Sequence, residues 1–233
     1  MQEGRYSKYR FERKFVSSQL DYKGLEQLIR LHPAFFKEIY WERQVNNIYF
    51  DTPALRYFFD NVVGKSERRK IRIRWYNDQD GIIEKPILEF KIKSGTLGRK
   101  VSFELAPIDL NADLEFDYFQ KIFKSSNFPE SVMEELRVLK PSLLNKYTRR
   151  YYRSADHHFR FTIDFNLQYF DFSQVSIAMG IGKRDLENTI LELKYDQEYD
   201  DEATEITQHL PIRMSKSSKY VNGIDIIRNN LAV

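Results

Sequence analysis

The chain has 233 residues, a net charge of +3, no cysteine and four histidines, which excludes disulfide bonds and thiolate metal sites and disfavours a His-rich zinc site. No apolar run approaches the roughly 20 residues of a membrane helix, and the N-terminus lacks the apolar core of a signal peptide. We therefore expect a cytoplasmic protein with a single domain over residues 1–233, without a transmembrane segment, that reaches a membrane only through a partner. Because the net charge is small, any basic site must be local.

The first third of the chain predicts two strands, each followed by a helix. Ser17 and Ser18 offer an N-cap for the first helix, which ends before Pro33. The sequence Asp51-Thr52-Pro53 predicts the start of a second, short helix that stops at Gly64. The expected elements are strand 10–16 with a possible extension at 6–8, helix 19–31, strand 40–50 and helix 53–63.

Most of the later strands alternate charged and apolar residues. In Lys70-Ile71-Arg72-Ile73-Arg74-Trp75-Tyr76 the cations fall on one side of a strand, about 7 Å apart, and the apolar residues on the other. Residues 145–153 are of mixed phase, which leaves open whether Arg149 or Arg150 lies on the charged side. The remaining expected elements are strands 70–76, 87–93 and 99–105, helices 109–125 and 129–140, strands 145–153, 159–165 and 190–195, a helix near 201–210 and a C-terminal helix after 214–220.

Six of the expected strands have an apolar face and an opposite face rich in Arg and Lys. An antiparallel sheet can turn such a face to solvent, which is one alternative. The predicted helices also need an apolar sheet face to cover, and if they cover the outside, the charged faces must point inward. This second alternative is an α+β fold in which a closed antiparallel β-barrel forms a tunnel with a basic lumen, flanked by α-helices. The pattern alone does not choose between the two.

A basic tunnel suits a polyphosphate chain, because Arg side chains clamp phosphate oxygens bidentately. A carboxylate among the cations would repel phosphate unless a divalent cation lay between them, and Mg²⁺ or Mn²⁺ held by one or two carboxylates and substrate oxygens fits that role. Nucleic acid is the competing polyanion. It usually comes with exposed aromatic platforms, whereas the aromatic residues here fall mostly in the apolar phase. We therefore do not expect nucleic acid as a partner.

Seven motifs, in this order, resemble the VTC domain, the catalytic domain of the vacuolar transporter chaperone polyphosphate polymerase in the CYTH-like triphosphate tunnel metalloenzyme superfamily. The resemblance spans nearly the whole chain. The motifs are Arg10-Phe11-Glu12-Arg13-Lys14, Asn47-Ile48-Tyr49-Phe50-Asp51-Thr52, Lys70-Ile71-Arg72-Ile73-Arg74-Trp75-Tyr76, Leu88-Glu89-Phe90-Lys91, Thr162-Ile163-Asp164, Leu191-Glu192-Leu193-Lys194 and Ser218-Lys219-Tyr220.

The resemblance implies transfer of the γ-phosphoryl group of ATP to a growing polyphosphate chain with Mn²⁺ or Mg²⁺, so that ATP, polyphosphate or triphosphate, and pyrophosphate are the expected partners. Glu192 matches the family's metal-binding glutamate, and Glu12 is the second metal candidate. The catalytic residues it implies are Lys14, Arg72, Arg74, Lys91, Arg149, Arg160 and Lys219. Further phosphate contacts are expected from Arg10, Lys93, Lys100, Lys194 and Ser218.

One position departs from the superfamily's hydrolases, which carry Glu-x-Glu-x-Lys on the first strand. Arg10 stands at the first Glu position here, which leaves Glu12 and Lys14. The loss of an acid weakens the case for a metal that activates water, and the added cation favours a longer polyanion. A polymerase is therefore expected. The alternatives are a tripolyphosphatase or nucleoside triphosphatase of the same superfamily, or a non-catalytic polyphosphate-binding module.

Several carboxylates also have simpler roles. An ion pair with a neighbouring cation is at least as well supported for Glu12 as metal binding. Glu89 and Glu104 are expected to balance charge rather than to catalyse, and Asp164 to orient a neighbouring arginine.

Overall fold

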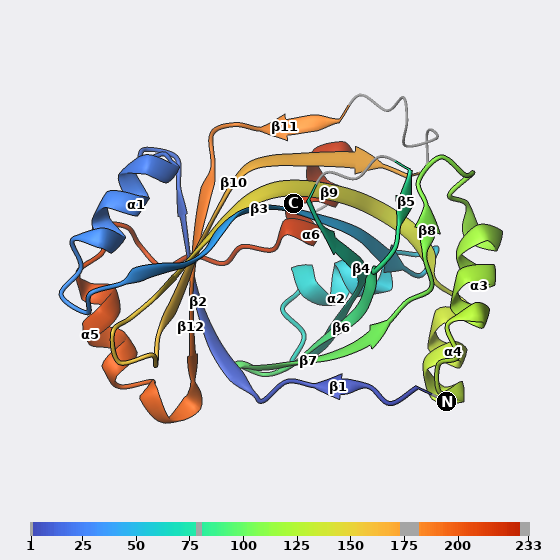
Figure 1. Ribbon diagram of the computed structural model, residues 1–233, viewed down its shortest axis with the longest axis horizontal. Coiled ribbons are helices and arrows are strands. Elements are labelled where there is room, and N and C mark those ends of the chain that lie inside the picture. Colours follow the sequence, from blue (N-terminus) through green and yellow to red (C-terminus); the bar gives the residue numbers. More distant parts are fainter. Residues whose placement is uncertain (1, 78–80, 173–181, 229–233) are drawn as a thin grey trace.

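A closed barrel of eight antiparallel strands forms the centre of the computed structural model, which describes residues 2–77, 81–172 and 182–228 (Figure 1). Its strands are β2 (Arg10–Ser17), β3 (Lys37–Asp51), β4 (Glu67–Tyr76), β6 (Ile87–Ser94), β7 (Leu97–Glu104), β9 (Lys140–Arg153), β10 (Arg160–Asp171) and β12 (Thr189–Asp196). The ring runs β7-β2-β12-β10-β9-β3-β4-β6, and β6 pairs back with β7. It closes narrowly between β2 and β7, where Arg10 and Gly98 are paired. The expected α+β barrel is confirmed.

Short strands and helices surround this ring. β1 (Arg5–Tyr6) pairs with β7, and β11 (Lys183–Asp185) pairs with the C-terminal part of β10. β5 (Ile82–Ile83) and β8 (Ile108–Asp109) form a separate two-stranded sheet. The helices are α1 (Tyr22–Arg30), α2 (Arg56–Val62), α3 (Phe116–Ser125), α4 (Glu130–Leu136), the short 3₁₀ helix η1 (Gln197–Tyr199), α5 (Glu202–Gln208) and α6 (Lys219–Ile227).

Several expected boundaries are wrong. Helix α3 begins at Phe116 rather than at residue 109, because Asp109 belongs to β8 and pairs with Ile82. Helix α4 ends at Leu136 rather than near 140, and β9 begins at Lys140, so that Pro141 lies within a strand opposite Phe50. Tertiary pairing with β3 therefore overrides the helix-ending role that the sequence suggested for this proline. Residues 6–8 do not extend β2, because the chain there pairs with β7 as β1 instead.

The expected caps also differ from those observed. Helix α1 is capped by Asp21, whose carboxylate accepts a hydrogen bond from the Gly24 amide, and not by the two serines. Asp51 belongs to β3, yet its carboxylate accepts hydrogen bonds from the amides of Tyr57 and Phe58 in the first turn of α2. Asp51 therefore caps the second helix as its sequence predicts, although the helix starts three residues after Pro53.

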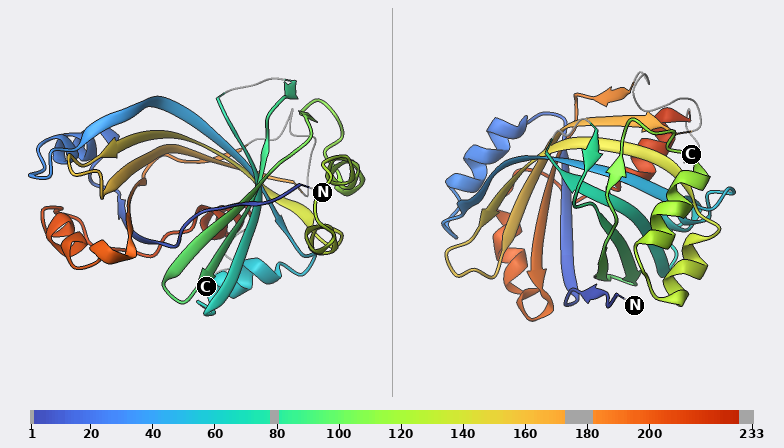
Figure 2. Two further views of the ribbon diagram at one scale, coloured as in Figure 1. Left: turned by 60° about the horizontal axis from the view of Figure 1, so that its bottom comes forward. Right: turned by 45° about the vertical axis from the view of Figure 1, so that its right-hand side comes forward.

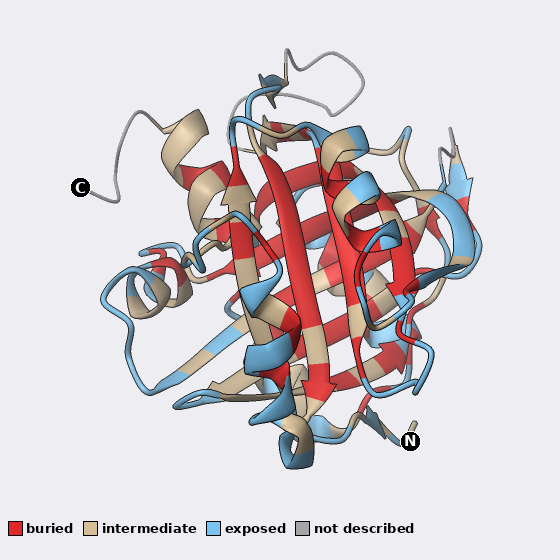
Figure 3. Cartoon of the chain, turned by 90° about the vertical axis from the view of Figure 1, so that its left-hand side faces the viewer, coloured by how far each residue is buried: buried red, intermediate tan, exposed pale blue. Residues whose placement is uncertain are grey.

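Two helical layers cover the apolar outer faces of the barrel at opposite ends (Figures 1 and 2). At one end α1 and α5 pack on β10 and β12, in a cluster that includes Leu25, Ile206 and Phe161. At the other end α3 and α4 pack on β4, β6 and β7, in a cluster that includes Phe119 and Ile71. Figure 3 shows long buried stretches along the strands, while much of the helical surface is exposed. No described helix is long and apolar enough to cross a membrane.

A third apolar cluster lies on the inner side of the barrel wall. Tyr49 is opposite Arg72 in the strand register, and Ile190 is two residues from Glu192, so both side chains share the parity of the charged residues. They pack with Tyr220 and Ile224 of α6. Helix α6, together with Phe58 of α2, therefore fills part of the barrel interior and leaves the remainder to charged side chains.

The packing of α6 can be tested by truncation. Ile224 is completely buried, so we expect Ile224→Ala to lower the free energy of unfolding by about 2–5 kcal/mol through lost burial and a residual cavity. Urea denaturation measures this change. As a control, Val63→Ala removes a side chain that is 75% exposed, and we expect a change within about 0.5 kcal/mol. Equal stability of the two variants would contradict the packing of α6 in the interior.

Candidate functional site

The charged faces of the strands point into the barrel. Arg74, Glu89, Arg149 and Glu192 are each at most 7% exposed. Their apolar neighbours in sequence, such as Ile73, belong instead to the clusters beneath the outer helices. The alternative of a solvated outer face is therefore wrong, and the basic interior is observed. The reason is that α1, α3, α4 and α5 pack on apolar outer faces of the wall, which leaves the charged faces inside.

Glu89 of β6 gathers cations from its two neighbouring strands. Its carboxylate accepts hydrogen bonds from Arg72 of β4 at 2.8 Å and from Lys100 of β7 at 2.6 Å, and lies 3.7 Å from the Arg74 guanidinium. Burial acts to raise the pKa of Glu89, but these cations outweigh it and hold the pKa well below its usual value. The charge-balancing role expected for Glu89 agrees with this geometry.

Asp164 of β10 forms a second ionic cluster. Its two oxygens accept hydrogen bonds from Nε and Nη2 of Arg149 at 2.5 and 2.6 Å, and Oδ2 also accepts one from Lys219 of α6 at 2.5 Å. Burial acts to raise the pKa of Asp164, and the two cations lower it to about 2. Asp164 thus orients an arginine, as expected. That arginine is Arg149, because Arg150 points outward to Glu26 and Glu42.

Glu12 and Glu192, the two metal candidates, have different surroundings. Both oxygens of Glu12 accept hydrogen bonds from Lys91, at 2.6 and 2.8 Å, so Glu12 is an ion-pair partner in this structure. Glu192 lies 3.4 Å from Lys194, 3.7 Å from Arg149 and 3.9 Å from Lys14. Among the described residues it accepts no hydrogen bond, although it is 5% exposed.

A divalent cation fits Glu192 better than Glu12. The Glu192 oxygens are free of close hydrogen bonds, and the nearby cations hold its pKa well below the usual value although burial acts to raise it, so the carboxylate is ionised. Within ranges 2–77, 81–172 and 182–228, no group of three or more His, Asp or Glu side chains could hold a metal by protein ligands alone. A single carboxylate of this kind suits Mg²⁺ or Mn²⁺, which would take substrate oxygens or water as its additional ligands.

Several interior cations lack a carboxylate partner. Arg160 and Lys93 form no hydrogen bond or ion pair with any described residue; the pKa of each is lowered, primarily by burial. Burial also lowers the pKa of Lys194 to about 8, although Glu192 and Glu12 act to raise it. Arg10 differs from these residues, because it lies at the rim, with a side chain 45% exposed and a 3.1 Å ion pair to Asp196.

The N-terminus of α6 enters the same region. Ser218 is its N-cap, and its hydroxyl accepts hydrogen bonds from the Val221 amide and, at 2.7 Å, from Lys70. Lys14 donates to the carbonyl of Ser217 at 2.8 Å. The backbone before α6 therefore holds two lysines of different strands towards the interior.

The sequence reasoning missed two interior residues as site residues. Lys70 has the parity of Arg72 and Arg74, and this signal was sufficient to include it. Tyr147 accepts a hydrogen bond from Arg74 at 3.2 Å, and its ring lies 5.2 Å from Arg149 and 4.7 Å from the Lys219 ammonium. No sequence signal distinguished this tyrosine from one in the core.

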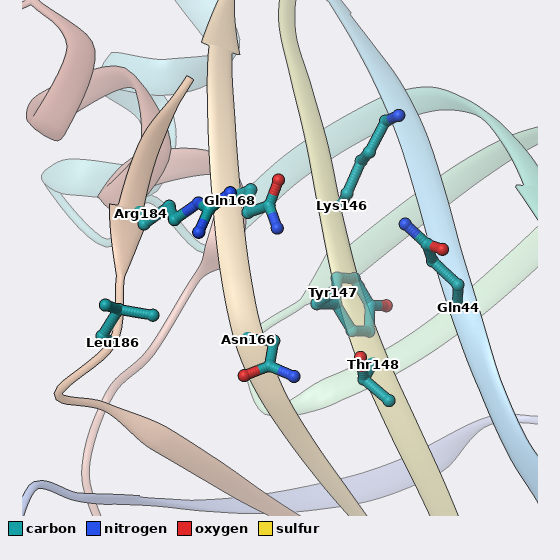
Figure 4. Close-up of a pocket in the computed structure, with 8 residues that line it drawn as sticks. All are labelled: Gln44, Lys146, Tyr147, Thr148, Asn166, Gln168, Arg184 and Leu186. Atoms are coloured by element: carbon teal, nitrogen blue, oxygen red, sulfur yellow. The ribbon is translucent and has the colours of Figure 1, made fainter. Parts of the chain in front are cut away.

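A pocket of about 380 Å³ lies on the outer side of the wall (Figure 4). Lys146, Gln168 and Arg184 are in register across β9, β10 and β11, and Lys146 has the opposite parity to Tyr147 and Arg149. These three side chains therefore lie on the opposite side of the wall from the basic interior, whereas Tyr147, which contacts Arg74 inside the barrel, also lines the pocket. Its lining residues are Gln44, Lys146, Tyr147, Thr148, Asn166, Gln168, Arg184 and Leu186.

The sequence matches the VTC domain over residues 9–228. The chain belongs to the VTC domain family. The predicted resemblance to the VTC domain is therefore confirmed. None of the curated proteins matches the chain.

Solved structures of similar shape include a protein of Pyrococcus horikoshii OT3, with 14% identity, a TM-score of 0.49 and coverage of 94% of this chain and 99% of that one. A putative adenylate cyclase of Vibrio parahaemolyticus has 10% identity, a TM-score of 0.48 and coverage of 91% and 97%. Another from Bacillus halodurans has 14% identity, a TM-score of 0.45 and coverage of 90% and 93%.

Arg160 allows a clean test of anion binding in this VTC domain. Its removal leaves no described carboxylate without a partner, so we expect Arg160→Met to weaken tripolyphosphate binding about tenfold without loss of fold. Arg150→Met is the matched control, because Arg150 lies on the outer side of the adjacent strand. Isothermal titration calorimetry measures both affinities. An equal effect of the two substitutions would argue against an interior anion site.

Lys194 predicts a pH dependence. With a pKa of about 8 it loses its proton as the pH rises through that value, and a bound polyanion favours the charged form. We therefore expect tripolyphosphate binding at pH 8.5 to take up protons, and affinity to fall as the pH rises above 8. Calorimetry in two buffers of different ionisation enthalpy measures the uptake. Lys194→Met should reduce the proton uptake. The control Lys23→Met, which replaces a lysine of α1, should not change it. An unchanged uptake in Lys194→Met would refute the assignment of the titrating group to Lys194.

Proposed function

We propose that this VTC domain is a metal-dependent polyphosphate polymerase that transfers the γ-phosphoryl group of ATP to a growing polyphosphate chain. The observation that carries the proposal is a barrel interior in which the described cations clearly outnumber the carboxylates. Phosphoryl transfer requires mainly that two polyanions be positioned and their charge neutralised. The interior contributes cations from β2, β4, β6, β7, β9, β10, β12 and α6, which suits a chain of phosphates rather than a single one.

The proposed phosphate contacts follow from the ion pairs. Arg160 and Lys93 are available without displacement of a carboxylate, and Lys14, Lys70 and Lys194 lie close by with pKa values lowered primarily by burial. Phosphate oxygens would relieve the mutual repulsion of these lysines. Arg72, Arg74, Lys91, Lys100, Arg149 and Lys219 are proposed to supply further contacts from their positions beside Glu89, Glu12 and Asp164.

Glu192 is the proposed protein ligand for Mn²⁺ or Mg²⁺, with Glu12 as a second candidate after release from Lys91. When bound, the cation would neutralise charge on the reacting phosphates. The residues of the chain would hold the donor and the acceptor in line.

The hydrogen bonds that the interior carboxylates accept from cations favour a polymerase over a hydrolase. A hydrolase needs a base or a metal that activates water. Glu12, Glu89 and Asp164 each accept short hydrogen bonds from cations, which lowers their basicity. In a polymerase a phosphate oxygen of the chain is itself the nucleophile, and no such base is required.

The activity test is incubation of the purified protein with ATP and Mn²⁺, followed by gel detection of polyphosphate. We expect chain growth from ATP to exceed phosphate release from tripolyphosphate at the same metal concentration. Rapid cleavage of tripolyphosphate without chain growth would support the hydrolase instead. Polyphosphate binding without turnover of either substrate would support a binding module.

Glu192→Gln tests the metal assignment. We expect metal-dependent turnover to fall at least a hundredfold, while metal-free tripolyphosphate binding is unchanged or tighter because a negative charge is removed. The control is Glu104→Gln, since Glu104 is exposed and pairs with Arg5. Rates and dissociation constants are compared for both variants. A fully active Glu192→Gln would reduce Glu192 to a charge-balancing role.

A further inference from the structure

Three tyrosines surround Arg43 at one side of the barrel interior. The guanidinium carbon of Arg43 lies 4.7 Å from the ring centre of Tyr40, 5.8 Å from that of Tyr76 and 5.9 Å from that of Tyr151. Tyr40 and Tyr151 also meet edge to face, with ring centres 5.5 Å apart. We call Tyr40, Arg43, Tyr76 and Tyr151 the tyrosine cluster.

The strand register places the tyrosine cluster directly beside the basic interior. Arg43 is opposite Arg149, and Tyr151 is opposite Thr162, which itself is opposite Glu192. The guanidinium of Arg149 lies 5.8 Å from the Tyr151 ring. A ligand that contacts both Arg149 and the tyrosine cluster therefore needs to span only a few ångströms.

A bulge in β3 creates this arrangement. The register shifts between Tyr40 and Arg43, where Trp41 and Glu42 of β3 lie opposite the single residue Arg150 of β9. The side chains of Tyr40 and Arg43 therefore turn to the same side. Strand β4 ends at Tyr76, opposite Val45, and within the described part of the chain residues 37–43 of β3 pair only with β9. Among the residues that the structure describes, no second strand pairs with this edge of the wall beside the tyrosine cluster, and Tyr40 is 48% exposed.

The chemistry of the tyrosine cluster differs from that of the remaining interior. It presents flat aromatic rings and one guanidinium, and Arg43 has no ion pair with a carboxylate of the described chain. Phosphates gain little from tyrosine rings, whereas a nucleobase stacks on aromatic rings and on guanidinium planes. Thr162, next to Tyr151, adds a buried hydroxyl with no hydrogen-bond partner in the described residues.

We propose that the tyrosine cluster binds the nucleobase of the phosphoryl donor, while the cations beyond Arg149 bind its phosphates. This inference rests on the proposed use of a nucleoside triphosphate. The donor then enters at the edge of β3 beside the tyrosine cluster, with its phosphates first. Stacking is tolerant of base identity because every base has a π-face, so ATP and GTP bind with similar affinity and inorganic tripolyphosphate gains nothing from the cluster.

The experiment compares the dissociation constants of ATP and tripolyphosphate by calorimetry under identical metal-free conditions. Tyr40→Leu is the main variant, because the side chain is half exposed and its loss spares the core. ATP binding weakens about five- to tenfold and tripolyphosphate binding changes less than twofold. Tyr40→Phe keeps the ring and retains wild-type affinity for ATP. Trp41→Leu is the control, since Trp41 is 91% exposed and its ring contacts no member of the tyrosine cluster in the described structure.

Each outcome decides between the two proposals. If wild type binds neither ATP nor tripolyphosphate, the proposed function fails. If wild type binds both and Tyr40→Leu weakens both equally or neither, the proposed function stands and the nucleobase site is refuted. Arg43→Met provides a second measurement: a loss of ATP affinity with unchanged tripolyphosphate affinity supports stacking, whereas an equal loss of both identifies Arg43 as a phosphate contact.

Discussion

The ion pairs inside the barrel are the constraint on which the structure depends. Glu89 joins β6 to cations of β4 and β7, and Asp164 joins β10 to β9 and α6. Glu12 of β2 pairs with Lys91 of β6. This ion pair links the two strands that flank β7, beside the narrow β2–β7 junction. Removing one member of such a buried pair leaves an uncompensated charge, which commonly costs 3–5 kcal/mol. The carboxylates therefore hold the wall together as well as the cations in place.

These pairs do not neutralise the interior completely, and the excess positive charge connects the fold with its proposed chemistry. The lowered pKa values of Lys14, Lys70 and Lys194 arise first from burial, and neighbouring cations contribute further at each of them. A phosphate chain would reverse that effect, because it favours the charged lysines. The proposed polyanion would therefore find cations already in place, and its binding would require little reorganisation.

Helices outside the barrel make this interior possible. The wall could bury either its apolar or its charged faces, and α1, α3, α4 and α5 supply apolar partners only on the outside. Helix α6, together with Phe58 of α2, is the exception. Its Tyr220 and Ile224 enter the interior, where Tyr49, Tyr147 and Ile190 replace charged residues on the inner faces of the strands. The barrel interior is therefore apolar around α6 and basic in the remaining part.

The sequence by itself determined the alternation of Lys70 to Tyr76 and of the other strands, and hence which side chains share a face, because a strand has a period of two. It did not determine which face points inward, since that depends on where distant helices pack. The choice between Arg149 and Arg150 followed from the pairing of β9 with β10, and the start of β9 at Lys140 from its pairing with β3. Tyr40, Arg43, Tyr76 and Tyr151 converge only because a bulge in β3 combines with its registers to β4 and to β9, which no local pattern encodes.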